Sequence, residues 1–271
     1  MPRPFRFGIL APVLTDVPTW RDQVRRIADQ GYSTLLMPDF PLTQPSPAPT
    51  LAVAASLTGM TVGTWVYALP LRPAWTTAWE AHSLSLLTDG RFELGIGTGR
   101  PGIEDELRDR GMPVLPRSAR LAQVREVVAE LRRFDGPDRR TPVAMAARGP
   151  QALAVAAEVA DTVAVALMPG DDRAGITRVV RDFRAAHPGK DIELAQQVPV
   201  VGDTFGAHLG VPSPDLAALH AADALEALPA DPAAAIEELQ RRREEIGFSY
   251  FVFGAVAADA LAPVVAALAG T

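Results

Sequence analysis

The sequence predicts a single (β/α)8 barrel of the TIM type, in which eight parallel strands are each followed by a helix. Three observations lead to this prediction. Short β-rich runs alternate with longer helical runs along the whole chain, eight such pairs can be counted, and 271 residues is a normal length for one such barrel. An open doubly wound sheet is the alternative, but it would leave the last strand and helix unexplained. No low-complexity linker divides the chain, so we expect one domain over residues 1–271.

The predicted strands are short runs rich in β-branched and aliphatic residues, bounded by residues that favour turns. The second strand, for example, stops before Pro38, and the fourth ends in a glycine loop over residues 97–102. In chain order, the predicted strands are residues 5–11, 33–37, 61–67, 91–96, 142–146, 162–167, 192–198 and 249–253.

The predicted helices are longer runs rich in alanine, leucine and arginine. In the first of them, Trp20, Val24 and Ile27 recur at spacings of three and four, and Gly31 ends the helix. In chain order, the predicted helices are residues 19–30, 49–57, 74–87, 118–134, 149–159, 171–186, 233–246 and 257–268. Between the predicted strand 192–198 and the predicted helix 233–246, residues 200–230 are predicted to be irregular with helical pieces.

Composition excludes several classes of protein. The net charge is −6 and no basic stripe is visible, so we expect no nucleic-acid partner. The chain has no cysteine, which rules out disulfides, thiolate metal sites and a cysteine nucleophile. No run approaches the roughly 18 apolar residues of a membrane helix. The first residues lack the apolar core of a secretion signal, so we expect a cytoplasmic protein.

Barrel enzymes carry their active sites on the loops that follow the strands. After the second predicted strand, Asp39 stands where a carboxylate would point into the barrel mouth, although aspartate beside proline is also a common turn residue. After the fourth strand, Gly95, Gly97 and Gly99 allow a flat ring or a phosphate to approach the backbone closely. Their spacing is that of neither a Rossmann fingerprint nor a P-loop, and a flexible turn is the plain alternative.

Two further strand ends carry candidate binding residues. After the fifth strand, Arg148, Gly149 and Pro150 open a helix, and the free N–H groups and positive dipole of such a terminus suit an anion. A simple helix start with a solvated arginine is the alternative. On the third strand, Trp65 and Tyr67 stand where barrels usually hold aliphatic residues. They either pack in the core or support a flat cofactor.

Other catalytic chemistries find little support. No two histidines have the spacing of a zinc site, and no G-x-S-x-G motif of a serine hydrolase is present. The four histidines are His82, His187, His208 and His220. The single lysine, Lys190, precedes the seventh strand and therefore lies at the wrong end of the barrel for a Schiff base. These observations argue against a lyase or hydrolase.

Taken together, the motifs resemble those of the bacterial luciferase-like superfamily, and most closely its coenzyme F420-dependent branch. The most specific segment is the run D-G-R-F-E-L-G-I-G-T-G over residues 89–99. The other matching segments are residues 5–8, 28–39, 62–64, 69–73, 149–153 and 160–161. The resemblance covers most of the chain and implies a luciferase-like barrel that binds F420, with FMN as the alternative cofactor.

The resemblance also implies roles for individual residues. Asp39 would face the polar edge of the ring system. Thr64, Trp65 and Val66 would lie at the third strand, where many members hold a non-proline cis peptide behind the ring. The ring edge and ribityl chain would lie along Gly97, Thr98 and Gly99. The phosphate would be received by Arg148, Gly149 and Pro150.

Two positions depart from the family pattern. Many relatives have histidine after the Pro-Asp of strand two, and that histidine is often proposed to move the proton, but Phe40 stands here. The catalytic positions implied by the resemblance are therefore Asp39 and Phe40, and the source of a substrate proton stays open between Tyr67, Glu104 and bound water. Many relatives also have Gly-Gly-Pro after strand five, where Arg148 replaces the first glycine.

The implied function is hydride transfer between F420 or FMN and a small organic substrate. Monooxygenation is the alternative if the cofactor is FMN. A barrel that binds a flavin or another ligand without turnover is a second alternative, which the missing histidine motivates. Homodimers are usual in the family, so we expect one here by analogy.

Overall fold

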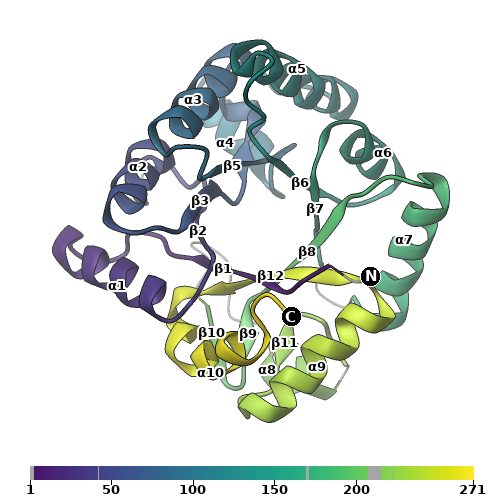
Figure 1. Cartoon of the computed structure of the whole chain (residues 1–271). Coiled ribbons are helices and arrows are strands. Elements are labelled where there is room, and N and C mark those ends of the chain that lie inside the picture. Colours follow the sequence, from purple (N-terminus) through teal and green to yellow (C-terminus); the bar gives the residue numbers. More distant parts are fainter. Residues whose placement is uncertain (1–2, 42, 169–170, 207–214, 222) are drawn as a thin grey trace.

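The predicted (β/α)8 barrel is confirmed by a computed structural model, which describes residues 3–41, 43–168, 171–206, 215–221 and 223–271. The strands form a closed parallel barrel, and the helices surround it (Figure 1). The order of neighbouring strands is β3-β2-β1-β12-β8-β7-β6-β5-β4. A further pairing between β3 and β5 closes the barrel, which the open-sheet alternative would lack.

The barrel strands lie at the places that the sequence predicts, with one interruption. They are β1 (Arg6–Leu10), β2 (Thr34–Met37), β3 (Thr61–Thr64), β4 (Tyr67–Ala68), β5 (Phe92–Gly97), β6 (Val143–Ala147), β7 (Thr162–Val165), β8 (Glu193–Val198) and β12 (Phe248–Gly254). The predicted strand 61–67 is divided into β3 and β4, because the chain bulges at Trp65 and Val66, whose shared peptide bond is cis. The barrel strands are almost wholly buried, because side chains on one face of each strand fill the barrel and those on the other face contact the helices.

The main helices form the outer layer. They are α1 (Val17–Asp29), α2 (Pro47–Leu57), α3 (Ala74–Leu87), α5 (Arg117–Asp135), α6 (Pro150–Val159), α7 (Arg173–Ala186), α9 (Pro232–Glu245) and α10 (Ala258–Leu268). In α1, Trp20, Val24 and Ile27 are buried as their spacing predicts, and the Asp16 carboxylate accepts a hydrogen bond from the Thr19 N–H at the helix start. No helix in the described ranges has both the length and the apolar character needed to span a bilayer.

Three local features were not predicted from the sequence: a short helix after β5, a small sheet and two 3-10 turns. A short helix, α4 (Ile103–Asp109), follows the glycine loop after β5. The segment predicted to be irregular contains a small sheet of β9 (Val200–Val201), β10 (Thr204–Phe205) and β11 (Ala227–Leu228), together with α8 (Leu216–Ala221). Two 3-10 turns, η1 (Leu69–Leu71) and η2 (Ala255–Ala257), complete the elements. His208 and the side chain of His220 lie outside what the structure describes.

The interior of the barrel holds a polar cluster at its amino-terminal end. The guanidinium of Arg6 donates to Glu93 and to Glu193, each over 2.8 Å, and lies 3.6 Å from the centre of the Tyr250 ring. The Tyr250 hydroxyl donates to Glu93 over 2.7 Å. Gly8 makes room for this ring, because a Cβ at that position would lie 2.9 Å from the Tyr250 hydroxyl. The cluster therefore closes the bottom of the barrel and leaves the opposite end for a site.

Candidate functional site

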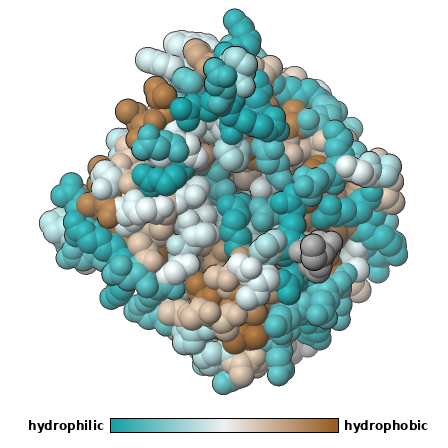
Figure 2. Space-filling model, in the orientation of Figure 1, coloured by the Kyte–Doolittle hydropathy of each residue, from teal (hydrophilic) through white to brown (hydrophobic). Residues whose placement is uncertain are grey.

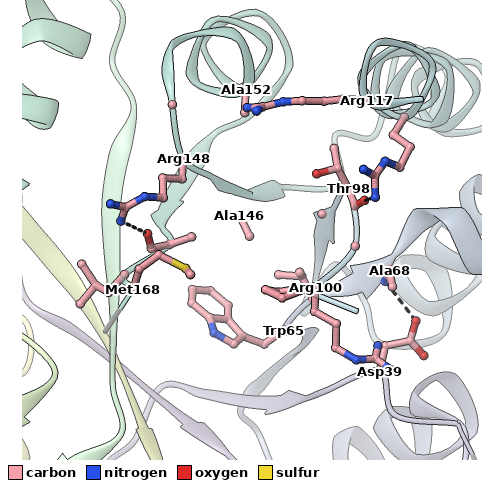
Figure 3. Close-up of a pocket in the computed structure, with 18 of the residues that line it drawn as sticks. Asp39, Trp65, Ala68, Thr98, Arg100, Arg117, Ala146, Arg148, Ala152 and Met168 are labelled. Atoms are coloured by element: carbon pink, nitrogen blue, oxygen red, sulfur yellow. Dashed lines mark hydrogen bonds between the residues drawn. The ribbon is translucent and has the colours of Figure 1, made fainter. Parts of the chain in front are cut away.

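A cavity of about 750 Å³ lies at the carboxyl ends of the barrel strands (Figure 3). It gathers most of the residues predicted from separate loops. The predicted residues that line it are Asp39, Phe40, Trp65, Val66, Gly97, Thr98, Gly99, Arg148 and Gly149. Thr64 and Pro150 were also predicted, and they are not among its lining residues. The mouth of the barrel is thus open, and its aromatic side chains form walls around the space.

The bulge between β3 and β4 forms one wall of this cavity. Thr64 holds the bulge in place, because its hydroxyl donates to the Gly95 carbonyl over 2.7 Å and accepts from the Gly95 N–H over 2.9 Å. The next residue, Trp65, donates from its indole N–H to Gln197 over 3.0 Å. Because these two anchors lie on β5 and β8, the faces of Trp65 and Val66 are fixed toward the cavity.

Glycine is required on β5 beside this bulge. A Cβ at Gly95 would lie 1.8 Å from the Thr64 carbonyl oxygen, and one at Gly97 would lie 2.9 Å from the Val66 side chain. The glycines of the G-x-G-x-G run therefore permit the close approach of two strands. Gly99 has a positive φ of 98° and turns the chain toward α4.

Asp39 is buried and is already engaged by protein groups. Its carboxylate accepts two hydrogen bonds from Arg72, over 2.7 and 3.2 Å, and a third from the Ala68 N–H over 3.1 Å. It therefore ties the end of β2 to β4 and η1. Phe40 lies beside it in the cavity wall, and the Arg100 guanidinium lies 4.8 Å from the centre of the Phe40 ring.

Two other residues considered as proton sources also have partners. The Tyr67 hydroxyl donates to Glu80 over 2.6 Å, and Tyr67 is not among the residues that line the cavity. Burial and the neighbouring Glu80 raise the pKa of Tyr67 well above its usual value. Glu104 does line the cavity, and it forms an ion pair with Arg120 over 3.0 Å.

The start of α6 offers a site for an anion. Its N-cap is Gly149, with a positive φ of 78° and no side chain that could cap the N–H groups. Arg148 precedes it, but both of its terminal nitrogens contact Asp171, with an Nη2–Oδ1 distance of 2.8 Å. The predicted cation at this terminus is therefore neutralised by an acidic residue 23 positions further along the chain.

A second arginine, Arg117, completes this anion site. It begins α5, and its side chain extends across the cavity toward Ala152 of α6 (Figure 3). One of its terminal nitrogens lies 3.5 Å from the position that a Cβ on Gly149 would occupy. Among the described residues, Arg117 has no acidic partner. Sequence reasoning missed it, because an arginine at the start of an amphipathic helix resembles any solvated residue.

A smaller cavity of about 300 Å³ adjoins the first and shares Trp65 and Val66 with it. Its walls are mostly apolar. Two polar side chains also line it, the amide of Gln197 at the end of β8 and the carboxyl of Glu226 just before β11. The apolar lining residues are Trp65, Val66, Ala146, Ala164, Val165, Ala166, Leu167 and Pro199. Burial, and then the charge of Asp171, raise the pKa of Glu226 above its ordinary value.

The histidines and the lysine whose side chains are described lie away from both cavities. His82 contacts the Asp135 carboxylate over 3.0 Å between α3 and α5, and His187 contacts the Phe183 carbonyl over 2.9 Å at the end of α7. Within the described ranges, no three His, Asp or Glu side chains gather in a way that could hold a metal ion.

The fold and these cavities define an α/β-barrel protein with a ligand-sized site at the carboxyl ends of its strands. Residues 6–136 match the model of the family described as luciferase-like monooxygenase. This match confirms, over residues 6–136, the resemblance to luciferase-like proteins seen in the sequence. No curated protein sequence matches the chain significantly.

Solved structures share the fold over nearly the whole chain. Coenzyme F420 dependent tetrahydromethanopterin reductase from Methanopyrus kandleri is similar with a TM-score of 0.71 and 18% identity, covering 97% of each chain. An F420-dependent secondary alcohol dehydrogenase, in complex with an F420–acetone adduct, has a TM-score of 0.69 and 16% identity over 96% of this chain and 99% of its own. A riboflavin lyase with modified FMN and riboflavin has a TM-score of 0.74 and 13% identity over 98% and 93%.

Proposed function

We propose that this protein is an oxidoreductase that uses coenzyme F420, or alternatively FMN, to transfer a hydride to or from a small organic substrate. The observation that carries the proposal is the shape and charge of the larger cavity. One end of this cavity is a rigid, largely apolar wall at the β3–β4 bulge. At its other end, Arg117, which has no acidic partner among the described residues, lies beside a helix start that no side chain caps. A flat ring with a phosphate tail needs both of these features.

The apolar end fits a tricyclic ring. Trp65, Val66 and Ala146 line it, and the glycine loop after β5 runs along its edge. At Gly97 and Gly99 the backbone is free of side chains, so a ring edge and a ribityl chain can approach it. The cavity volume of about 750 Å³ is within the range of cofactor sites.

The charged end fits a phosphate. Arg117 and the first N–H groups of α6 converge on one side of the cavity, and both favour an anion. Arg148 holds Asp171 in this region, so we assign it to shaping the loop and assign the phosphate contact to Arg117. F420 and FMN both carry a phosphate on the ribityl chain, so this contact supports either cofactor.

When bound, either cofactor supplies a ring that gains or releases a hydride. The protein's part is to bind the phosphate, orient one face of the ring at the bulge, and present the substrate beside it. The smaller cavity of about 300 Å³ adjoins the ring wall at Trp65, and we place the substrate there. Its mostly apolar walls suit a compact enone, aldehyde, ketone or secondary alcohol.

Titration of the purified protein with F420 and, separately, with FMN tests the proposal. We expect micromolar or tighter binding of at least one, followed by cofactor fluorescence. Arg117→Gln should weaken this binding about tenfold or more, because one charge-assisted contact to the phosphate is lost. The matched control is Arg133→Gln near the end of the same helix, where Arg133 pairs with Glu130 at the surface and lines neither cavity. Failure of the wild-type protein to bind either cofactor would refute the proposal.

Two alternatives predict different results after binding. A non-catalytic barrel would hold the reduced cofactor without reacting it with any of a panel of enones, quinones, aldehydes and ketones. A monooxygenase would bind FMN and consume oxygen only when a substrate is present. Substrate-dependent oxidation of the reduced cofactor under anaerobic conditions distinguishes hydride transfer from both.

A further inference from the structure

The smaller cavity contains one acidic side chain that neither the family motifs nor the sequence patterns mark. We propose that Glu226 is the acid–base residue of this site, which gives a proton to the substrate during reduction and takes one during oxidation. This inference rests on the proposed hydride transfer, and it supplies the group that the replacement of histidine by Phe40 leaves missing.

The backbone at Glu226 is held by a buried arginine. Arg242 of α9 donates one hydrogen bond to the Leu225 carbonyl and another to the Ala227 carbonyl, each over 2.7 Å. A third hydrogen bond, over 2.6 Å, joins its Nε to Glu238 and balances its charge. Because the carbonyls on both sides of Glu226 are fixed, the residue between them has a defined position, as an acid–base group requires.

The core and the small sheet add to this support. Leu225 and Leu228 are fully buried, and the Glu226 carbonyl accepts from the Val200 N–H over 3.1 Å. The side chain amide of Gln196, also fully buried, donates to the Leu225 carbonyl. Residues 225–228 are therefore anchored by several independent contacts, and Glu226 is the member of this run that lines the cavity.

The surroundings of the Glu226 carboxyl favour its protonated form. Among the described residues, no cation or hydrogen-bond donor contacts this carboxyl. The charged group that acts on it is Asp171, which repels a second negative charge, while Arg148 is engaged by Asp171. Burial and this repulsion raise the pKa of Glu226, which brings it closer to neutral pH, where acid–base catalysis is most effective.

The other acidic groups in the two cavities are engaged elsewhere. The carboxylate of Asp39 is occupied by Arg72, and that of Glu104 by Arg120. Each of these carboxylates is therefore already occupied by an arginine. Of the three acidic residues among the described lining of these two cavities, Glu226 is the one without an arginine partner.

The chemical step balances with this single proton. When an enone is reduced, the bound cofactor would supply the hydride that forms a C–H bond at the β-carbon, and the C=C electron pair would move toward the carbonyl. The Glu226 O–H bond breaks and its proton completes the saturated product, which leaves a carboxylate that regains a proton from water. In the reverse direction, the carboxylate accepts a proton as the hydride leaves the carbon.

The test compares Glu226→Gln, which keeps the shape and hydrogen-bonding capacity but cannot donate an acidic proton, with Glu226→Asp and with Glu237→Gln. Glu237 is exposed on α9 and lines neither cavity, so its variant is a matched control. Cyclohex-2-enone is the substrate probe. Single-turnover oxidation of the bound reduced cofactor is measured against pH, together with cofactor affinity. Infrared difference spectra of the cofactor-free proteins record the carboxyl C=O band.

We expect Glu226→Gln to bind the cofactor as tightly as wild type and to react about 100-fold or more slowly. The wild-type rate should fall as pH rises through the titration of Glu226, and this dependence should disappear in the variant. Glu226→Asp should retain part of the rate. In the cofactor-free protein, a protonated-carboxyl band should persist above the pH at which an ordinary glutamate titrates, about pH 4.3, and be absent from Glu226→Gln.

Three results would overturn the inference. A Glu226→Gln rate within threefold of wild type at every pH is one, and the absence of the raised carboxyl band is another. The third is failure of the wild-type protein to bind either cofactor. That result would also refute the proposed function, and the cofactor titration by itself reveals it. In the first two cases the cofactor still binds, so the proposed function survives without this role for Glu226.

Discussion

Replacing Arg6 by methionine tests whether the polar cluster at the bottom of the barrel stabilises the fold. The substitution keeps an aliphatic chain over the Tyr250 ring but removes the cation that bridges Glu93 and Glu193. The side chains of these two residues are 5% and 11% exposed, so their carboxylates would be left close together with little access to water. Removing one partner of a buried ion pair typically costs about 3–5 kcal/mol.

The expected loss is somewhat smaller here. Arg6 itself keeps 28% of its side chain exposed, so water reaches the group and part of the interaction is already screened. Burial lowers the pKa of the Arg6 guanidinium, but the nearby Tyr250, Glu93 and Glu193 outweigh that effect and raise it overall. We therefore expect Arg6→Met to lower the free energy of unfolding by about 2–4 kcal/mol, and Tm by about 5–15 °C.

Urea denaturation followed by far-ultraviolet circular dichroism measures this difference. Arg125→Met is the control, because Arg125 also contacts a carboxylate with two nitrogens, that of Glu158, but at the exposed surface of α5. Surface pairs of this kind contribute at most about 1 kcal/mol. If both variants lost the same small amount, the cluster would contribute no more than a surface ion pair and the reasoning would be refuted.

Three further predictions follow from other features. All three tyrosines have a raised pKa, chiefly because they are buried. The unfolded chain therefore loses their protons first, and the free energy of unfolding should fall above about pH 10 by up to about 4 kcal/mol per pH unit. Tyrosinate absorbance should rise only as the far-ultraviolet circular dichroism of the folded protein is lost. Gly95→Ala should lower Tm by more than 5 °C and weaken cofactor binding, because its Cβ would meet the Thr64 carbonyl, whereas Gly59→Ala, with open space around it, should do neither. The homodimer remains a prediction, and its candidate contact is the pair Trp75 and Trp79, which stack on α3 and are each more than half exposed. Replacing both by serine should give a protein that sediments as a monomer. A wild-type protein that is itself monomeric would contradict the prediction. Figure 2 shows hydrophobic side chains over α3 at the edge of the molecule.

Much of the barrel could be predicted because its strands and helices have strong local signals. The strands are short apolar runs closed by glycine or proline, and the spacing of Trp20, Val24 and Ile27 indicates a helix with one buried face. The division of the third strand could not be read from periodicity. It depends on Thr64 and Gly95, which lie on different strands and approach only in the closed barrel.

The candidate site was predictable where it depends on loop glycines and less so where it depends on charge. Arg148 adjoins the helix start in sequence, but only the fold shows that Asp171 contacts it. Arg117 reaches the same helix start from a different helix, 32 positions earlier than Gly149 in the numbering. Glu226 follows an alanine-rich segment with no periodicity, and no local pattern indicates that it reaches the ends of β7 and β8.

The contacts that Arg242 makes with the carbonyls of Leu225 and Ala227 involve only main-chain atoms of those residues. The chain path at position 226 is therefore independent of which side chain stands there. Homologues and engineered variants could exchange this one residue and acquire a different substrate range while the barrel keeps its shape. A library randomised at position 226 alone would thus sample new reactivity with little loss of soluble protein.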